Sequence, residues 1–121
     1  MGGATVFALI ASAGGGESSA LHALNGGKSY AEVCAECHGA TLGGGKGPPL
    51  RGAGFLQNWQ HKTARDLYSR ILTTMPASAP GTLPEEDVLD ITIYILGQNG
   101  VDVGSQLKAS PDALGAIPMN P

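Results

Sequence analysis

Cys34-Ala35-Glu36-Cys37-His38 is the stretch that decides how this chain folds. A C-x-x-C-H run is the pattern of covalent haem attachment, in which two thioethers hold the porphyrin and the adjacent imidazole lies beneath the iron. The run contains the only two cysteines of the chain, so no thiol is left for a disulfide elsewhere. We therefore predict one haem c, bound covalently through Cys34 and Cys37, with His38 as an axial ligand of the iron.

Two other uses of paired cysteines fit less well. A thioredoxin-like C-x-x-C follows a strand in a βαβ unit, and no strand-rich segment precedes Cys34. A structural zinc site closes with four ligands. The other histidines, His22 and His61, lack a paired spacing with the cysteines, and we expect both at the surface.

Composition indicates one small domain with a thin core. The chain has 121 residues, 19 glycines, 8 prolines and a net charge of −3, and no basic patch suggests nucleic-acid binding. No apolar run reaches the ~18 residues of a membrane span. The few large side chains leave room for a buried macrocycle at the centre, so we expect the apoprotein to be poorly folded. The aromatic residues are Phe7, Tyr30, Phe55, Trp59, Tyr68 and Tyr94.

Changes in composition divide the chain into three parts. Residues 1–24 read as a flexible N-terminal tail or the remnant of an export signal, because Thr5–Ala13 is apolar but Met1–Ile10 has no Lys or Arg. We expect the folded domain to span residues 25–100. Residues 101–121 are turn-rich, and we expect a C-terminal extension packed on the surface.

Apolar periodicity predicts three main helices joined by long loops. The first should run from about Gly27 to Cys37, with Asn25 as its N-cap. The second should cover Thr63–Leu72 and the third about Pro84–Leu96. Thr63 with Asp66, and Thr82 with Glu85, are predicted capping pairs for the last two helices. Between the first two helices, Gly39–Gly54 is expected to wrap the haem edge as a loop.

Met75 is the predicted second axial ligand of the iron. Pro76 stops the preceding helix and favours an extended backbone at Met75, which would turn the thioether towards the iron. A role as core filler is the common alternative for a methionine. Met119 and Met1 are weaker candidates, and His61 would give a bis-histidine haem instead.

These pieces together resemble the class I c-type cytochromes over residues 26–98. Gly26 and Tyr30 match the family's glycine and aromatic residue of the first helix, and Tyr94 matches the aromatic residue of the last. Gly47-Pro48-Pro49-Leu50 looks like the Gly-Pro-x-Leu element, and Met75-Pro76 like the distal-ligand signature. The resemblance implies an all-α, cytochrome c-like fold around one covalent haem, in which the Pro48 carbonyl accepts the free N–H of His38 and Leu50 contacts the haem.

A narrower resemblance is to cytochromes associated with pyrroloquinoline-quinone-dependent dehydrogenases. It is carried by Phe55-x-x-x-Trp59, by Pro80-Gly81 after Met75-Pro76, by Tyr94-x-Leu96-x-x-Asn99-Gly100, and by Gly104 and Leu107. By analogy, the Trp59 indole N–H would reach a haem propionate, and Arg51 is a further propionate candidate. A core aromatic and a solvated loop charge are the plainer readings of these two residues.

The resemblance implies a monohaem carrier of single electrons rather than an enzyme. Its donor would be a periplasmic quinoprotein dehydrogenase and its acceptor an oxidase or another cytochrome, with the protein periplasmic or otherwise exported and monomeric. A haem domain of a larger quinohaemoprotein dehydrogenase is an alternative, and a peroxidase-like haem enzyme with an open iron site is another. Because no ring of lysines stands out, we expect docking to be weakly charged.

Overall fold

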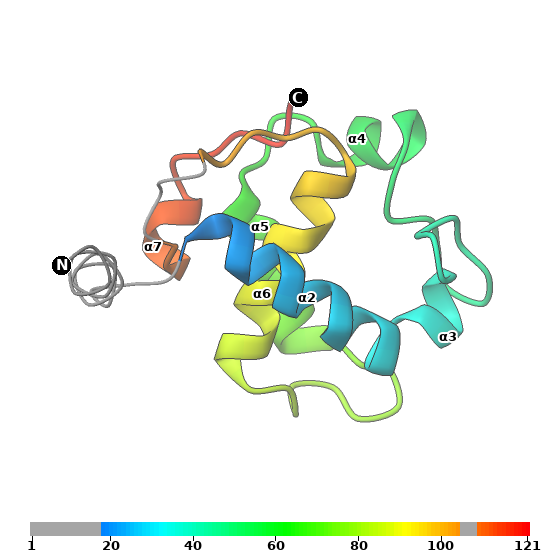
Figure 1. Ribbon diagram of the computed structural model, residues 1–121. Coiled ribbons are helices and arrows are strands. Elements are labelled where there is room, and N and C mark those ends of the chain that lie inside the picture. Colours follow the sequence, from blue (N-terminus) through cyan, green and yellow to red (C-terminus); the bar gives the residue numbers. More distant parts are fainter. Residues whose placement is uncertain (1–17, 105–108) are drawn as a thin grey trace, which may run out of the picture.

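The computed structural model describes residues 18–104 and 109–121, which form helices and no strand. The predicted all-α class is therefore confirmed for these residues. Figure 1 shows α2 crossing α6 at the centre, with α3 and α4 on the opposite side of the molecule from α7. The helices are α2 (Ser19–Val33), α3 (Ala35–His38), α4 (Ala53–Trp59), α5 (Ala64–Thr74), α6 (Glu85–Gln98) and α7 (Pro111–Leu114).

Helix α2 begins earlier than the sequence predicts. Its N-cap is Ser18, whose hydroxyl accepts a hydrogen bond from the Leu21 N–H at 3.3 Å, so Asn25 lies inside the helix and is not its cap. Residues 19–24 are therefore helical and do not belong to a flexible tail. The rest of the predicted tail, residues 1–17, lies outside the described residues.

Helices α5 and α6 lie close to their predicted positions, with one difference in capping. The Thr63–Asp66 capping box is confirmed, because the Asp66 carboxylate accepts the Thr63 N–H at 2.8 Å. This bond lowers the pKa of the Asp66 carboxyl. The predicted Thr82–Glu85 pair is wrong, because Pro84 is the N-cap of α6 and the Thr82 hydroxyl donates to the Ala79 carbonyl at 2.7 Å.

The crossing of α2 over α6 depends on Gly26. A Cβ atom at this position would lie 1.9 Å from the Asp90 carbonyl oxygen, so only glycine lets the two backbones approach this closely. Beside this contact the Tyr30 and Tyr94 rings pack at a tilt of 43°, with their centroids 5.5 Å apart. His22 pairs with the Asp90 carboxylate and is only 11% exposed, so its predicted surface position is wrong.

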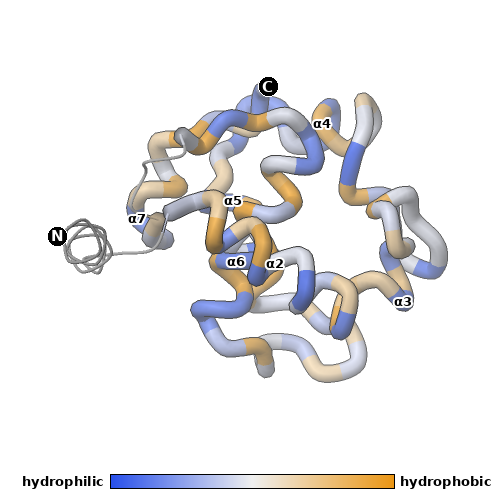
Figure 2. The backbone as a smooth tube through the Cα atoms, in the orientation of Figure 1, coloured by the Kyte–Doolittle hydropathy of each residue, from blue (hydrophilic) through white to orange (hydrophobic). Residues whose placement is uncertain are grey.

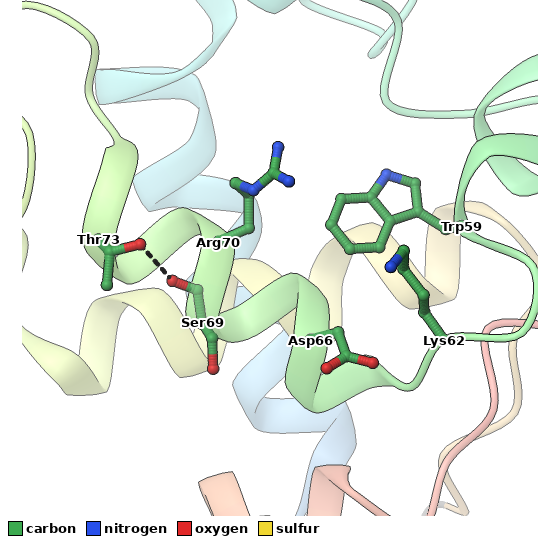
Figure 3. Close-up of a pocket in the computed structure, with 6 residues that line it drawn as sticks. All are labelled: Trp59, Lys62, Asp66, Ser69, Arg70 and Thr73. Carbon is green, nitrogen blue, oxygen red and sulfur yellow. Dashed lines mark hydrogen bonds between the residues drawn. The ribbon is translucent and has the colours of Figure 1, made fainter.

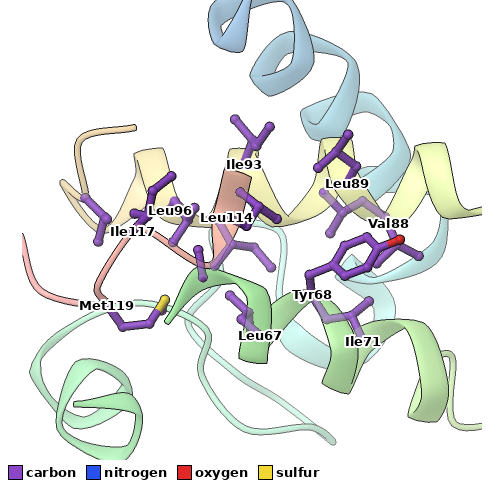
Figure 4. Packing of buried hydrophobic residues seen from close by; sticks show 14 of the residues in the cluster. Leu67, Tyr68, Ile71, Val88, Leu89, Ile93, Leu96, Leu114, Ile117 and Met119 are labelled. Atoms are coloured by element: carbon purple, nitrogen blue, oxygen red, sulfur yellow. The ribbon is translucent and has the colours of Figure 1, made fainter. Parts of the chain in front are cut away.

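The segment after residue 100 contributes to the core. Figure 4 shows Leu114, Ile117 and Met119 among the apolar side chains of α5 and α6, and all three are buried. The sequence predicts an extension packed on the surface instead, and that expectation is wrong for these side chains. Leu107, which carries part of the narrower resemblance, lies outside the described residues.

Helix α6 is the centre of this core. Its buried residues surround the helix on most sides, and Figure 2 shows the apolar stretches of α6 in the middle of the bundle. A helix that is apolar nearly all round has to be covered by neighbouring elements. Helices α2 and α5 cover it here, and part of its remaining surface lines the cavity described below. The buried residues of α6 are Val88, Leu89, Ile91, Thr92, Ile93, Ile95 and Leu96.

The segment predicted as a long loop ends in the short helix α4. Gly52, with φ of +97°, precedes this helix. The Asn99 side chain fastens the segment to the end of α6, because its amide donates to the Leu50 carbonyl at 2.9 Å and its oxygen accepts the Gly52 N–H at 3.0 Å. The loop is thereby fixed beside the cavity.

Candidate haem site

One cavity of about 840 Å³ brings together the residues that the sequence singles out. Cys34, Cys37, His38 and Met75 all line it. Its volume lies within the ~300–1,000 Å³ typical of pockets that enclose a ligand. The rest of the lining is largely apolar and comes from α4, α5, α6 and the loop before α6, with Phe55, Leu67, Ile71, Leu83, Ile91 and Ile95 as its main residues.

The two cysteines lie where α2 passes into α3. Cys34 sits between the two helices, and its carbonyl accepts the N–H groups of Cys37 at 3.2 Å and His38 at 3.0 Å. This single turn places both sulfurs and the imidazole at the same cavity. Cys34 is half-buried and Cys37 is exposed. In the chain without haem, burial raises the pKa of the Cys34 thiol to about 11.

The imidazole of His38 is buried and held by the backbone of the following loop. Its Nδ1 lies 2.7 Å from the Pro48 carbonyl oxygen. Because a carbonyl can only accept, Nδ1 carries the proton and Nε2 keeps the lone pair that a metal needs. A Cβ atom at Gly47 would lie 2.8 Å from ring atom Cε1 and 2.9 Å from Nδ1, so the loop rests directly on the ring.

Met75 reaches the cavity from the residue that ends α5. Its backbone is extended, with φ of −115° and ψ of 154°, as expected before Pro76. Its N–H donates to the Ile71 carbonyl at 3.0 Å and its carbonyl accepts the Gly81 N–H at 3.3 Å. The segment around Met75 is thus fixed at both sides, and the side chain is half-buried against the core.

Aromatic and cationic side chains lie at the rim of the cavity. Figure 3 shows Trp59, Lys62 and Arg70 around an adjoining groove of about 330 Å³ that shares these three residues with the cavity. The guanidinium carbon of Arg70 lies 5.7 Å from the centre of the Trp59 ring. Of the two predicted propionate partners, Trp59 lies at the cavity, whereas Arg51 is exposed and is not among the lining residues.

Arg70 and Lys62 are site residues that the sequence analysis missed. Arg70 could have been found from helical spacing, because Leu67, Arg70, Ile71 and Thr74 all line the cavity and lie three, four and seven residues apart on α5. Lys62 has no comparable signal, since it precedes the helix in a turn.

Of the remaining residues predicted to contact the haem, some line the cavity and others do not. Pro48 and Leu50 line the cavity. Met119 is 1% exposed within the core and His61 is exposed, and neither is among the lining residues. Within residues 18–104 and 109–121, no group of three or more His, Cys, Asp or Glu side chains is placed to hold a metal ion.

These residues fit a haem. The cavity has the size and apolar lining for a macrocycle, two thiols lie at its edge, and an imidazole is held through Nδ1 with its second nitrogen available. The fold and this site define a c-type cytochrome domain.

Comparison with known families agrees with this class. Residues 22–95 match the family model described as cytochrome c oxidase, cbb3-type, subunit III, and the chain belongs to this cytochrome c family. It therefore carries covalent haem c through Cys34 and Cys37 and functions in electron transport. No curated protein and no solved structure matches the chain significantly. Among the described helices, none has the length and apolar character that crossing a membrane requires.

Proposed function

We propose that the protein carries single electrons with His38 Nε2 and Met75 Sδ as the two axial ligands of its haem iron. The haem supplies the redox chemistry, the exchange of one electron between the ferrous and ferric states. The observation that carries the proposal is the convergence of Cys34, Cys37, His38 and Met75 on one cavity. His38 comes from α3 and Met75 from the end of α5, so two separately fixed segments supply the two ligands.

The residues around these ligands suit a carrier. An imidazole with a thioether partner favours a high reduction potential. The carbonyl of Pro48 orients the imidazole and strengthens it as a donor. Apolar side chains from α5 and α6 exclude water from the cavity, and this raises the cost of a net charge at its centre. His38 and Met75 would hold the haem from segments that are fixed by backbone hydrogen bonds, so little movement of the chain would accompany the transfer of an electron.

The rim residues offer a place for the two carboxylates of the haem. Lys62 and Arg70 supply positive charge beside the Trp59 indole, whose N–H is a donor. We assign the carboxylate-binding role to these three residues rather than to Arg51. A cation held over an aromatic ring is also restricted in its motion, so Arg70 is pre-positioned for this contact.

The partners follow from the two resemblances. The donor is a periplasmic quinoprotein dehydrogenase and the acceptor is an oxidase or another cytochrome. The matched family model describes a subunit of a cbb3-type oxidase, which supports an oxidase on the acceptor side. Proteins of the c-type class are generally exported, and we place this one in the periplasm as a monomer.

A second candidate is a haem domain within a larger enzyme, either a quinohaemoprotein dehydrogenase or an oxidase assembly. The family match favours this candidate, because the model it meets describes a subunit and not a free carrier. The chemistry of the site is the same in both cases. A peroxidase-like enzyme needs an open iron site, and Met75 at the cavity argues against it.

Two matched substitutions test the axial ligand. Met75→Leu and Met119→Leu each replace a thioether by an apolar side chain of similar volume, which costs less than about 1.5 kcal/mol of stability in a packed site. Met75→Leu should abolish the near-infrared sulfur-to-iron band of the oxidised protein and let the reduced protein bind carbon monoxide. Met119→Leu should leave the band in place, because Met119 lies in the core.

The opposite pattern would contradict the ligand assignment. A sulfur-to-iron band that survives Met75→Leu would remove Met75 from the iron, and loss of the band in Met119→Leu alone would place Met119 there. A wild-type protein that binds carbon monoxide readily and shows a high-spin spectrum would favour the open-site enzyme.

A further inference from the structure

The side chain of Asn99 joins two walls of the haem cavity, although Asn99 is not among the lining residues. Its Nδ2 donates to the carbonyl oxygens of Leu50 and Ile95, at 2.9 Å each, and both of these residues line the cavity. Its Oδ1 accepts the Gly52 N–H at 3.0 Å. Leu50 belongs to the loop after α3 and Ile95 to α6, so one amide ties the loop to the helix. Figure 1 shows the end of α6 on the side of the molecule where α4 lies.

These three hydrogen bonds require an amide at position 99. Two carbonyl oxygens need two donors and a backbone N–H needs an acceptor, and the side chain of Asn99 offers this combination. An ionised carboxylate of the same shape would bring an oxygen against both carbonyls. The backbone of Asn99 has a φ of −105°, which residues other than asparagine also adopt. The side chain, and not the backbone, therefore accounts for asparagine at the end of α6.

The loop that Asn99 holds is the loop that holds His38. The Pro48 carbonyl oxygen, which lies 2.7 Å from His38 Nδ1, is two residues before Leu50. Asn99 thus fixes the backbone immediately after the group that orients the imidazole. Movement of Leu50 away from α6 would draw the Pro48 carbonyl away from the ring.

Other hydrogen bonds of this loop lead back to α3. The Gly44 N–H donates to the His38 carbonyl at 2.7 Å, and the Gly47 N–H donates to the Cys37 carbonyl at 2.8 Å. These bonds move together with the helix that carries the imidazole, so they do not fix the loop against the rest of the molecule. The bonds of Asn99 do so, because α6 is the centre of the hydrophobic core.

We propose that Asn99 is a positioning residue for His38. By fixing the loop, it keeps the Pro48 carbonyl on the Nδ1 proton and so helps to set the reduction potential of the haem. The inference rests on the proposed function, because the imidazole affects the potential only as a ligand of the iron. A hydrogen bond from Nδ1–H makes the imidazole a stronger donor, and a stronger donor favours the ferric state. Release of the loop therefore raises the potential.

Proton exchange at His38 Nδ1 measures the hydrogen bond to Pro48 directly. The ¹⁵N-labelled holoprotein is reduced and transferred to D₂O, and nuclear magnetic resonance follows the loss of the Nδ1–H signal. Asn99→Ala removes all three bonds and should speed this exchange by about ten-fold or more, because the loop opens locally. Exchange of the Met75 N–H, which donates to the Ile71 carbonyl, should change by less than about two-fold, because α5 makes no bond to Asn99.

Gln98→Ala is the matched control. Gln98 is the neighbouring residue, is exposed and does not line the cavity, so its loss should leave both the exchange rates and the reduction potential as in the wild type. Asn99→Ala should have a higher potential than Gln98→Ala, and both changes replace an uncharged amide by alanine. Asn99→Asp keeps the side-chain volume and the acceptor for the Gly52 N–H but loses both donors. It should speed exchange at His38 Nδ1 as Asn99→Ala does.

Two kinds of result would overturn the inference. Exchange at His38 Nδ1 that is equal in the wild type and in both Asn99 variants would show that Asn99 does not hold the ring. Equal acceleration at His38 Nδ1 and at the Met75 N–H would show a general loss of stability instead. A potential of Asn99→Ala equal to or below that of Gln98→Ala would break the link to the haem.

Failure of the proposed function would appear in the wild type instead. The ring current of the porphyrin shifts the proton signals of groups bound at the iron strongly to high field in the reduced protein. Wild-type His38 and Met75 signals without these shifts would remove both axial ligands, and with them the basis of this inference. Shifted wild-type signals together with unaffected Asn99 variants would overturn the positioning role alone.

Discussion

At the scale of single residues, the orientation of the His38 ring is set by backbone atoms of the next loop. Pro48 accepts the Nδ1 proton at 2.7 Å, and Gly47 lies against the ring with its N–H bonded to the Cys37 carbonyl at 2.8 Å. The absence of a side chain at Gly47 is what allows this contact, because a Cβ would lie 2.8 Å from the ring. Gly47 is thus a positioning residue for the imidazole.

Gly47→Ala should rotate or displace the imidazole without removing the haem. We expect intact covalent attachment by mass, with altered g-values in the electron paramagnetic resonance spectrum of the oxidised protein and a shifted reduction potential. Gly43→Ala is the matched control, because its Cβ would meet only the Thr41 hydroxyl at 3.9 Å. Equal spectra for wild type and Gly47→Ala would show that the loop does not position the ring.

Tyr30 makes stability depend on pH in the alkaline range. Its hydroxyl donates to the Gly39 carbonyl at 2.6 Å. Burial raises the pKa of Tyr30 to about 12. In the unfolded chain the phenol ionises near its ordinary pKa of about 10. The native state therefore holds a proton that the unfolded state has lost, and stability falls as pH rises from about 10 to about 12.

The Tyr30→Phe variant isolates this effect. Below pH 10 it should be less stable than the wild type by about 1 kcal/mol, the usual net value of one hydrogen bond. Between about pH 10 and pH 12 the difference should shrink, because only the wild type must ionise Tyr30 on unfolding. Guanidinium unfolding of both proteins, repeated between about pH 10 and pH 12, measures this difference in the free energy of unfolding. A difference that stays constant with pH would contradict the assigned role of burial.

At the scale of the elements, the α2–α6 crossing depends on close backbone contact at Gly26. Gly26→Ala would place a methyl group 1.9 Å from the Asp90 carbonyl oxygen, so one helix has to move. We expect a loss of at least about 2 kcal/mol in the free energy of unfolding, the usual scale of overpacking, although alanine favours helix by about 1 kcal/mol.

Gly97→Ala provides the control for this crossing. Gly97 lies in α6 with nothing within 4 Å of its Cβ position, so alanine should stabilise the protein by about 0.5–1 kcal/mol. Denaturant unfolding gives the free energy of unfolding of both variants. The same glycine-to-alanine change is thus compared at the α2–α6 contact and at a position with no neighbour. A Gly26→Ala protein as stable as the wild type would show that the crossing tolerates separation.

Local patterns were sufficient to predict the helices that end at clear signals. The capping box at Thr63 and the stop at Pro76 bracket α5, and both are read from neighbouring residues. The start of α2 was missed because Asn25-Gly26-Gly27 resembles a helix break. Those glycines are needed for the contact with α6, which is a long-range requirement that local propensity cannot show.

In the candidate site, too, residues in local motifs could be predicted from the sequence, whereas residues placed by long-range contacts could not. The cysteines, His38 and Met75 belong to short motifs, so the sequence alone could single them out, and all four line one cavity. Arg70 and Lys62 line the cavity whereas Arg51 does not. For Arg70, this position depends on which face of α5 meets the cavity, and the sequence alone does not show that. The burial of Met119 depends on where the end of the chain returns, which its turn-rich sequence does not indicate.

At the scale of the whole molecule, the haem replaces part of the hydrophobic core. The cavity of about 840 Å³ is lined by apolar side chains of α4, α5 and α6 that would meet water without a macrocycle. Cavities of this size in a 121-residue chain remove much of the packing that a small domain needs. We therefore expect folding and haem binding to be coupled.

Loss of haem attachment should leave the chain poorly folded. The Cys34→Ser, Cys37→Ser protein, expressed without haem, should lose most of the far-ultraviolet circular dichroism of its helices and show no cooperative thermal transition. The holoprotein is the control and should unfold cooperatively. A haem-free chain with a cooperative transition near that of the holoprotein would show that the core is complete without the macrocycle.

Intact mass of the protein matured in a host that attaches haem c tests the central claim most directly. The account predicts the mass of the polypeptide plus one haem, with no thiol left to react with an alkylating reagent after denaturation. The bare polypeptide mass with two alkylated thiols, at Cys34 and Cys37, would contradict it.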